Sequence, residues 1–155
     1  MSTILALDLG MNTGWAIYKP SEGIEFGSED FSVKKRKRGT PPRCTSFMDF
    51  HCWLDNLMSI HGIKTVYYEE VMRHAGTRAA HCYGAFECLM EISGHTIGIK
   101  PIGIPVGTIK KFATGNGHAK KPEMISSAIS AGLDVTDDDQ ADAVHLLRYV
   151  LYGKD

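Results

Sequence analysis

The first strand of this sequence contains a carboxylate at a position where a buried apolar residue is expected. Residues 4–10, ILALDLG, are almost continuously apolar, and such a run is typical of a strand covered on both faces. Asp8 interrupts the run. A carboxylate is costly to remove from water unless it is paired, hydrogen-bonded or bound to a metal ion. Any fold for this chain must therefore give Asp8 a partner.

The apolar pattern predicts strands that alternate with helices after an opening meander. Three strands are expected at 3–9, 15–18 and 24–33, with a tight turn at 10–14. Further strands are predicted at 64–71 and 96–104, and helices at 47–61, 77–92, 109–113, 122–132 and 138–152. This order predicts an α/β protein with a five-stranded mixed sheet and helices on both faces. The 155 residues are expected to form a single domain, 1–155.

Charge is unevenly distributed along the chain, although the net charge is only −1. Basic residues form one run and two pairs: Lys34, Lys35, Arg36, Lys37 and Arg38, then Lys110-Lys111 and Lys120-Lys121. Acidic residues gather at 69–70 and at 137–142. Basic stretches hold phosphates, whereas clustered carboxylates repel them unless cations intervene. The two together predict metal-dependent work on a polyanion.

The acidic residues occur in three elements that a sheet can bring together. Asp8 lies in the first strand, Glu69 and Glu70 end the fourth, and Asp139 and Asp142 share one face of the last helix. If the first and fourth strands are neighbours, these carboxylates meet at one point. Magnesium prefers such oxygen ligands, and a pair of these ions can promote phosphodiester cleavage by water. We therefore expect Asp8 to face a metal ion.

Four segments in order carry a resemblance to a known family. They are LALDLGMNTGWAI (5–17), VYYEEV (66–71), GTIKKFATGNGHAKKPEMI (107–125) and DDDQADAVHLL (137–147). Through them the chain resembles the RuvC-type Holliday junction resolvases of the ribonuclease H-like superfamily, especially the shorter phage and prophage members. The resemblance implies a ribonuclease H-like fold over almost the whole chain.

The resemblance also implies roles for the acids and for two lysines. Asp8, Glu69, Asp139 and Asp142 would hold Mg²⁺, which Mn²⁺ is expected to replace. Glu69 fits the family pattern better than Glu70. Lysines near the scissile phosphate neutralise developing charge. The matching positions are Lys110 and Lys121, with Lys120 as the alternative to Lys121. His145, one turn beyond Asp142, either supports the metal site or packs in the core.

Family members are homodimers that bind a four-way DNA junction, and this implies two contact surfaces. Met72 stands where better-known members carry an aromatic residue that inserts at the junction, and Arg73, His74 or Arg78 are expected to add contacts there. The basic run 34–38 is expected to grip the DNA backbone. The dimer is expected to form through the helix that contains Ala80, Gly84 and Cys88, although this stripe of small residues also suits packing of the helix on its own sheet.

The resemblance thus implies a metal-dependent, structure-selective endodeoxyribonuclease of DNA recombination and repair. It would resolve four-way (Holliday) junctions by paired symmetric nicks, with water attacking the phosphodiester. One alternative is a broader debranching nuclease that cuts forks, flaps and three-way junctions, and another is a non-catalytic junction-binding relative. DLGMNTG also resembles the phosphate motif of actin-like ATPases and sugar kinases, but that class needs two such domains. No run is apolar enough to cross a bilayer and no export signal is evident, so a cytoplasmic protein is expected.

Overall fold

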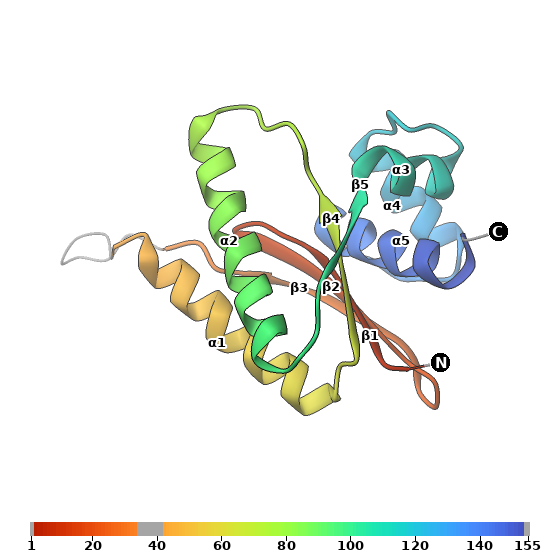
Figure 1. Ribbon diagram of the computed structural model, residues 1–155. Helices are drawn as coiled ribbons and strands as arrows, with labels where there is room; N and C mark the ends of the chain where they lie inside the picture. The colour runs from red at the N-terminus through yellow and green to blue at the C-terminus, as the bar shows by residue number, and fades with distance from the viewer. Residues whose placement is uncertain (1, 34–41, 154–155) are drawn as a thin grey trace.

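A five-stranded mixed sheet forms the centre of the molecule, as the sequence predicted (Figure 1). The computed structural model describes residues 2–33 and 42–153, so the basic run 34–38 lies outside the described residues. The strands are β1 (Ile4–Asp8), β2 (Asn12–Lys19), β3 (Gly23–Asp30), β4 (Thr65–Glu70) and β5 (Ile102–Pro105). Their order across the sheet is β3-β2-β1-β4-β5, and β1 runs antiparallel to β2 but parallel to β4. The first and fourth strands are therefore neighbours at the sheet centre.

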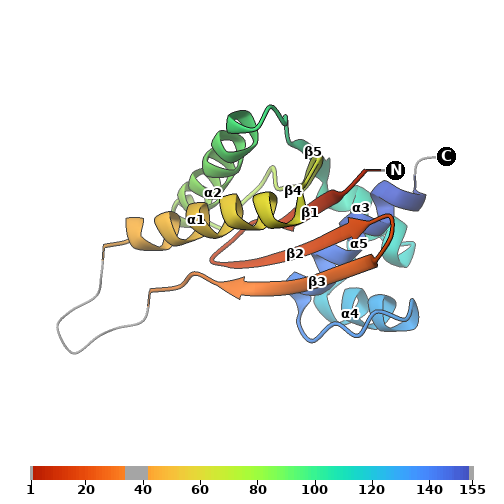
Figure 2. The same cartoon turned by 90° about the horizontal axis from the view of Figure 1, so that it is seen from below.

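Helices cover both faces of this sheet (Figure 2). One face carries α1 (Cys44–His61) and α2 (Thr77–Thr96). The other carries α3 (Val106–Thr114), α4 (Lys121–Ser130) and α5 (Asp138–Tyr152). In the part of the chain that the structure describes, no helix is long and apolar enough to cross a membrane.

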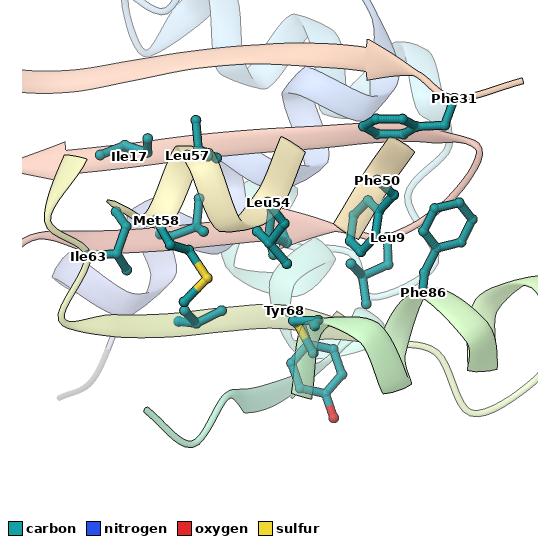
Figure 3. Close-up of a cluster of buried hydrophobic side chains, with 14 of the residues drawn as sticks. Leu9, Ile17, Phe31, Phe50, Leu54, Leu57, Met58, Ile63, Tyr68 and Phe86 are labelled. Carbon is teal, nitrogen blue, oxygen red and sulfur yellow. The ribbon is translucent and has the colours of Figure 1, made fainter. Parts of the chain in front are cut away.

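Alternation along β1 divides its side chains between two hydrophobic cores. Leu5, Leu7 and Leu9 belong to the core beneath α1 and α2, where Phe50 and Phe86 pack edge to face with ring centres 4.7 Å apart (Figure 3). Ala6 belongs to the core beneath α5. Because successive side chains of a strand point to opposite faces, Asp8 lies on the α5 side.

Small residues let α5 approach the sheet closely. Ala6, Ala16 and Ala141 are fully buried between the strands and this helix. At Gly14 the approach is closer still, since a Cβ placed there would overlap the backbone carbonyl of Asp139. Gly14 lies within β2 rather than in the predicted turn at 10–14, because β2 already begins at Asn12. The glycine is needed for packing against α5.

The end of α2 differs from the prediction. The helix continues to Thr96, so no strand begins there, and β5 starts only at Ile102. Gly94 is buried inside the helix, and a Cβ on it would lie 2.6 Å from the carbonyl oxygen of Ile99. The glycine therefore makes room for the returning chain instead of ending the helix. The left-handed residue beyond the helix is Gly98, with φ of 75°.

Candidate metal and nuclease site

Three of the predicted acids meet where β1 and β4 end. Leu7 pairs with Tyr68 in the parallel register, so Asp8 and Glu69 are the next residues along neighbouring strands. Both face α5, which contributes Asp142. One carboxylate oxygen from each of Asp8, Glu69 and Asp142 lies within 4.8 Å of the others. Asp8 and Asp142 are the two members of this group that are farthest apart in the sequence, 134 positions. The fold brings their side chains together.

The surroundings of these acids favour their protonated forms. Burial raises the pKa of Asp8 well above its usual value, and the charges of Glu69 and Asp142 raise it further. Burial raises the pKa of Glu69 to about 7, with a further contribution from Asp142. Burial also raises the pKa of Asp142 to about 6. Each carboxylate is therefore held in a site that disfavours its own charge.

This acidic group fits a divalent cation. Oδ1 of Asp142 is buried and has no hydrogen-bond partner among the described residues. A buried carboxylate oxygen without a donor is costly, and a cation removes both this cost and the mutual repulsion of the acids. Carboxylate oxygens are the ligands that Mg²⁺ and Mn²⁺ prefer. Asp8, Glu69 and Asp142 are therefore suited to hold such an ion.

Asp139 lies beside this group rather than within it. It is one turn before Asp142 on α5, and its charge raises the pKa of both Asp8 and Glu69. Burial, followed by the charge of Asp138, raises its own pKa to about 6. Asp139 is thus close enough to influence the charge of the acids, but it lies outside the group of three.

Two of the predicted lysines stand near the acids. Lys110 on α3 opposes the upward pKa shifts of Glu69 and Asp142. Lys121, in the first turn of α4, lowers the pKa of Asp142 and forms an ion pair with Asp138. Lys120 instead occupies the N-cap of α4, where its backbone N–H donates to Glu123. This geometry favours Lys121 over Lys120 as the second lysine.

Glu70 and His145 lie away from the acidic group. Glu70 follows Glu69 in β4 and points to the opposite face of the sheet. His145 is fully buried, and its Nε2 lies 2.9 Å from the carbonyl oxygen of Met124. Arg148 contacts its other ring nitrogen. His145 is thus a packed core residue, the second of the two roles considered for it.

Tyr83 is a residue that the sequence did not single out for the site. Its hydroxyl donates a hydrogen bond to the backbone carbonyl of Glu69 (2.9 Å) and accepts one from the N–H of Val71 (3.2 Å). It therefore ties α2 to the end of β4. No local sequence pattern shows a hydrogen bond between distant elements, so this role of Tyr83 could not be predicted.

The segment after β4 and the exposed side of α2 are open to solvent. Met72 is 79% exposed, and Arg73 is exposed beside it. On α2, Gly84 and Cys88 are exposed, Ala80 is half-buried, and nothing lies within 4 Å of a Cβ placed on Gly84. The small-residue stripe does not pack on its own sheet, so that alternative is wrong.

Two curated relatives of this chain carry the same name. No protein-family model matches the chain. It is 29% identical over 135 residues to the crossover junction endodeoxyribonuclease RuvC of Ehrlichia chaffeensis, covering 85% of this chain and 83% of the relative. The protein of the same name from Ehrlichia canis is 27% identical over 124 residues, covering 78% of this chain and 76% of the relative.

Solved structures show the same fold. RuvC of T. thermophilus in complex with Holliday junction substrate superposes with a TM-score of 0.74 and 17% identity, covering 99% of this chain and 95% of that one. The yeast mitochondrial Holliday junction resolvase Ydc2 gives a TM-score of 0.63 at 14% identity, covering 94% and 75%. These neighbours confirm the predicted ribonuclease H-like fold.

Proposed function

We propose that this chain, whose resemblance to the RuvC-type resolvases is confirmed by its relatives, is a metal-dependent endodeoxyribonuclease that resolves four-way DNA junctions. The observation that carries this proposal is the group formed by Asp8, Glu69 and Asp142, with a buried oxygen of Asp142 left without a donor. A protein that only binds DNA has no need of such a group. Its cost in stability is explained if the group holds a catalytic ion.

Each residue of the site has a distinct part in the proposed reaction. Asp8, Glu69 and Asp142 would hold Mg²⁺ or Mn²⁺, with Asp139 at the border of the site. When bound there, such an ion supplies Lewis acidity and lowers the pKa of water, as phosphodiester hydrolysis requires. The ammonium group of Lys110 balances the charge that develops on the phosphate.

Lys121 and Tyr83 support this arrangement. The side chain of Lys121 is 74% exposed while it pairs with Asp138, so it can exchange this partner for a phosphate of the substrate at little cost. Tyr83 fixes the backbone of Glu69 and thereby the direction of its carboxylate. The reacting strand would enter between the acids and these lysines.

Branched DNA is the proposed substrate, bound by a homodimer. A two-fold protein suits a four-way junction because both present related halves. The exposed stripe of Ala80, Gly84 and Cys88 on α2 is the proposed dimer surface. Met72 and Arg73 extend into solvent next to the site and would contact the junction centre. The basic residues 34–38, outside the described ranges, would hold the DNA backbone.

A broader debranching nuclease is the second candidate, and Met72 favours it. The side chain at this exposed position is unbranched and flexible, and it lacks the aromatic face on which bases stack. Opening of a four-way junction would then depend less on stacking. Forks and three-way junctions would be cut about as well as four-way junctions.

Cleavage of a synthetic mobile four-way junction tests the proposal. Linear duplex and a three-way fork are assayed alongside, with Mg²⁺, with Mn²⁺ and with chelator, for the wild type, Asp8→Asn and the exposed control Asp134→Asn. We expect the wild type and Asp134→Asn to make paired, metal-dependent nicks. Asp8→Asn should make none. Equal cutting of forks would favour debranching, and tight binding without cutting under either metal would contradict a nuclease.

A further inference from the structure

A cavity of about 350 Å³ opens between the beginnings of α1 and α2. Its wall includes Arg43 and Ser46 from α1, Arg78 and Cys82 from α2, and Met11 from the turn after β1. The acids described above lie on the α5 face of the sheet, so the cavity belongs to a separate place in the fold. None of its lining residues is part of the acidic group.

The N-cap and first turn of α1 line this cavity, and α2 adds Arg78 from its first turn. Neither helix is capped by a side chain of its N-cap residue, Arg43 in α1 and Gly76 in α2, and neither first turn contains an acidic residue. The N–H of Thr45 already donates to the carbonyl of Pro42, but the dipole at the start of α1 still favours an anion nearby. Arg43 and Arg78 add two full positive charges at the same place. Within the ranges 2–33 and 42–153, no carboxylate forms a salt bridge with either arginine.

The hydroxyl of Ser46 gives an independent indication of a ligand. Ser46 is fully buried on the cavity wall, and its hydroxyl has no hydrogen-bond partner among the described residues. Buried polar groups without partners are rare, because each one costs free energy. The guanidinium of Arg43 makes a weak contact of 3.5 Å with Sγ of Cys82 and lies 5.7 Å from the centre of the Phe47 ring. Two arginines and a buried serine thus line one cavity, and no carboxylate is among the lining residues that the structure describes.

The cavity lies at the same end of the sheet as the acids. Met11 on its wall is three residues after Asp8, so their Cα atoms are separated by no more than about 11 Å. A DNA strand that passes over the acids therefore has further backbone phosphates within reach of this cavity. Phosphate oxygens match the fork of an arginine and the N–H groups of a helix end.

We propose that the cavity formed by Arg43, Ser46 and Arg78 binds one backbone phosphate of the DNA strand whose neighbouring phosphodiester lies at the acidic site. The site would set how far the strand extends past the acids, without reading its sequence. This inference rests on the proposed function for the identity of the strand. It adds a fixed second contact, which determines the position of the nick.

Junction binding in chelator tests the site without relying on cleavage. Arg43→Gln/Arg78→Gln is compared with Lys64→Gln/Lys100→Gln, which removes the same charge from exposed lysines near the opposite end of β4 and β5. We expect the arginine variant to bind at least about tenfold more weakly and its salt dependence to decrease by about one phosphate contact. The lysine control should stay within about twofold of the wild type. Equal losses in both variants would overturn the proposal.

Substitution of single phosphates by uncharged methylphosphonates locates the contact. A methylphosphonate at one position near the nick should weaken binding by the wild type. The same substitution should not change binding by the arginine variant. If the arginine variant is as sensitive as the wild type at every position, the cavity holds no phosphate. Because binding is measured, this result stands whether or not the chain proves to be a nuclease.

Ser46→Ala provides a variant that keeps the fold. The hydroxyl has no partner within the described protein, so its removal should leave the melting temperature unchanged or raise it. Binding of the junction should nevertheless weaken. The methylphosphonate at the same position should reduce binding by Ser46→Ala less than it reduces binding by the wild type. Unchanged binding by Ser46→Ala together with an unchanged methylphosphonate pattern would contradict the proposed site.

Discussion

Asp8, Glu69 and Asp142 bring negative charge into a place that the fold largely shields from water. Burial and mutual repulsion raise the pKa of each one, so the ionised forms oppose folding. Residues that reduce stability without a bound partner are typical of functional sites. At the scale of single residues, the strongest sign of function is therefore that ionising Asp8, Glu69 and Asp142 reduces the stability of the folded chain.

Asp142→Asn should separate this cost from the function. Removing one charge relieves repulsion, and we expect the metal-free protein at pH 8 to gain about 1–2 kcal/mol in free energy of unfolding. Stabilisation by Mg²⁺ and cleavage should both be lost. Urea unfolding with chelator and with Mg²⁺ measures the first two effects. A variant that is less stable than the wild type in chelator would contradict this account, and Asp134→Asn should change neither quantity.

Tyr83→Phe tests how Glu69 is held. Burial raises the pKa of Tyr83 to about 12, so its hydroxyl stays protonated and donates to the carbonyl of Glu69 near neutral pH. Loss of the hydroxyl leaves that carbonyl and the N–H of Val71 without this partner, at a cost of about 1–3 kcal/mol. We expect kcat to fall while the Kd for the junction stays unchanged. A change in Kd alone would show that Tyr83 acts on DNA binding instead.

At the scale of elements, α5 completes the site through its contact with β2. Gly14 allows that contact, because any larger residue there meets the backbone of Asp139. Asp139 and Asp142 share a face of α5, so the position of this helix sets their distance from Asp8. The packing of α5 on β2 therefore determines the distances between the acids.

Gly14→Ala should therefore impair both stability and the metal site. The added methyl group must displace α5, and overpacking of this kind costs about 1–3 kcal/mol. Melting temperature and Mg²⁺ affinity from titration should fall together. Gly10→Ala is the milder comparison, since its Cβ would meet only the carbonyl of Asn12 at 3.2 Å. Normal Mg²⁺ affinity in a destabilised Gly14→Ala would refute the link.

The sequence predicted the elements better than their ends. The apolar run around Asp8 and the spacing of Asp139 and Asp142 predicted the centre of the sheet and the acidic group, because both depend on local periodicity. The helix predicted over 77–92 ended too early, because a glycine such as Gly94 can either end a helix or admit a neighbouring chain, and only the tertiary structure distinguishes the two. The meeting of Arg43 with Arg78 left no local signal, since it depends on how α1 packs beside α2.

For the molecule as a whole, the raised pKa values predict an unusual dependence of stability on pH. The folded protein holds protons on Asp139 and Asp142 up to about pH 6 and on Glu69 up to about pH 7, whereas their usual values are 3.8 and 4.5. Between about pH 4 and 7 the folded state binds more protons than the unfolded state. The contribution of these groups to stability is thus present at low pH and decreases as pH rises through this window.

Thermal unfolding from pH 4 to 8 measures this dependence. In chelator, we expect the acids to lower the melting temperature as pH rises from about 4 to 7, relative to the Asp142→Asn variant. With saturating Mg²⁺ the trend should reverse, because the ion binds the ionised acids and its affinity grows as they lose protons. If the melting temperatures of the wild type and the variant change in parallel with pH in chelator, the raised pKa values of the acids do not reduce stability.

The exposed stripe on α2 predicts the oligomeric state. Gly84→Arg places a large charged side chain on this surface, where the monomer has free space, so the fold should persist while the homodimer dissociates. Sedimentation velocity gives the mass, and cleavage would show single nicks in place of paired ones. Gly84→Ala is the matched change, since it keeps the stripe small. A Gly84→Arg protein of unchanged mass would place the interface elsewhere.

The order in which the acids occur along the chain has a consequence for the time of synthesis. Asp8 and Glu69 emerge from the ribosome early, but Asp142 belongs to α5, the last helix in the described chain. The site needs α5 to dock on β2 before its third carboxylate is in place. A nascent or truncated chain that ends before this helix has Asp8 and Glu69 but not Asp142. A chain whose synthesis has not yet reached α5 therefore lacks the third carboxylate of this group.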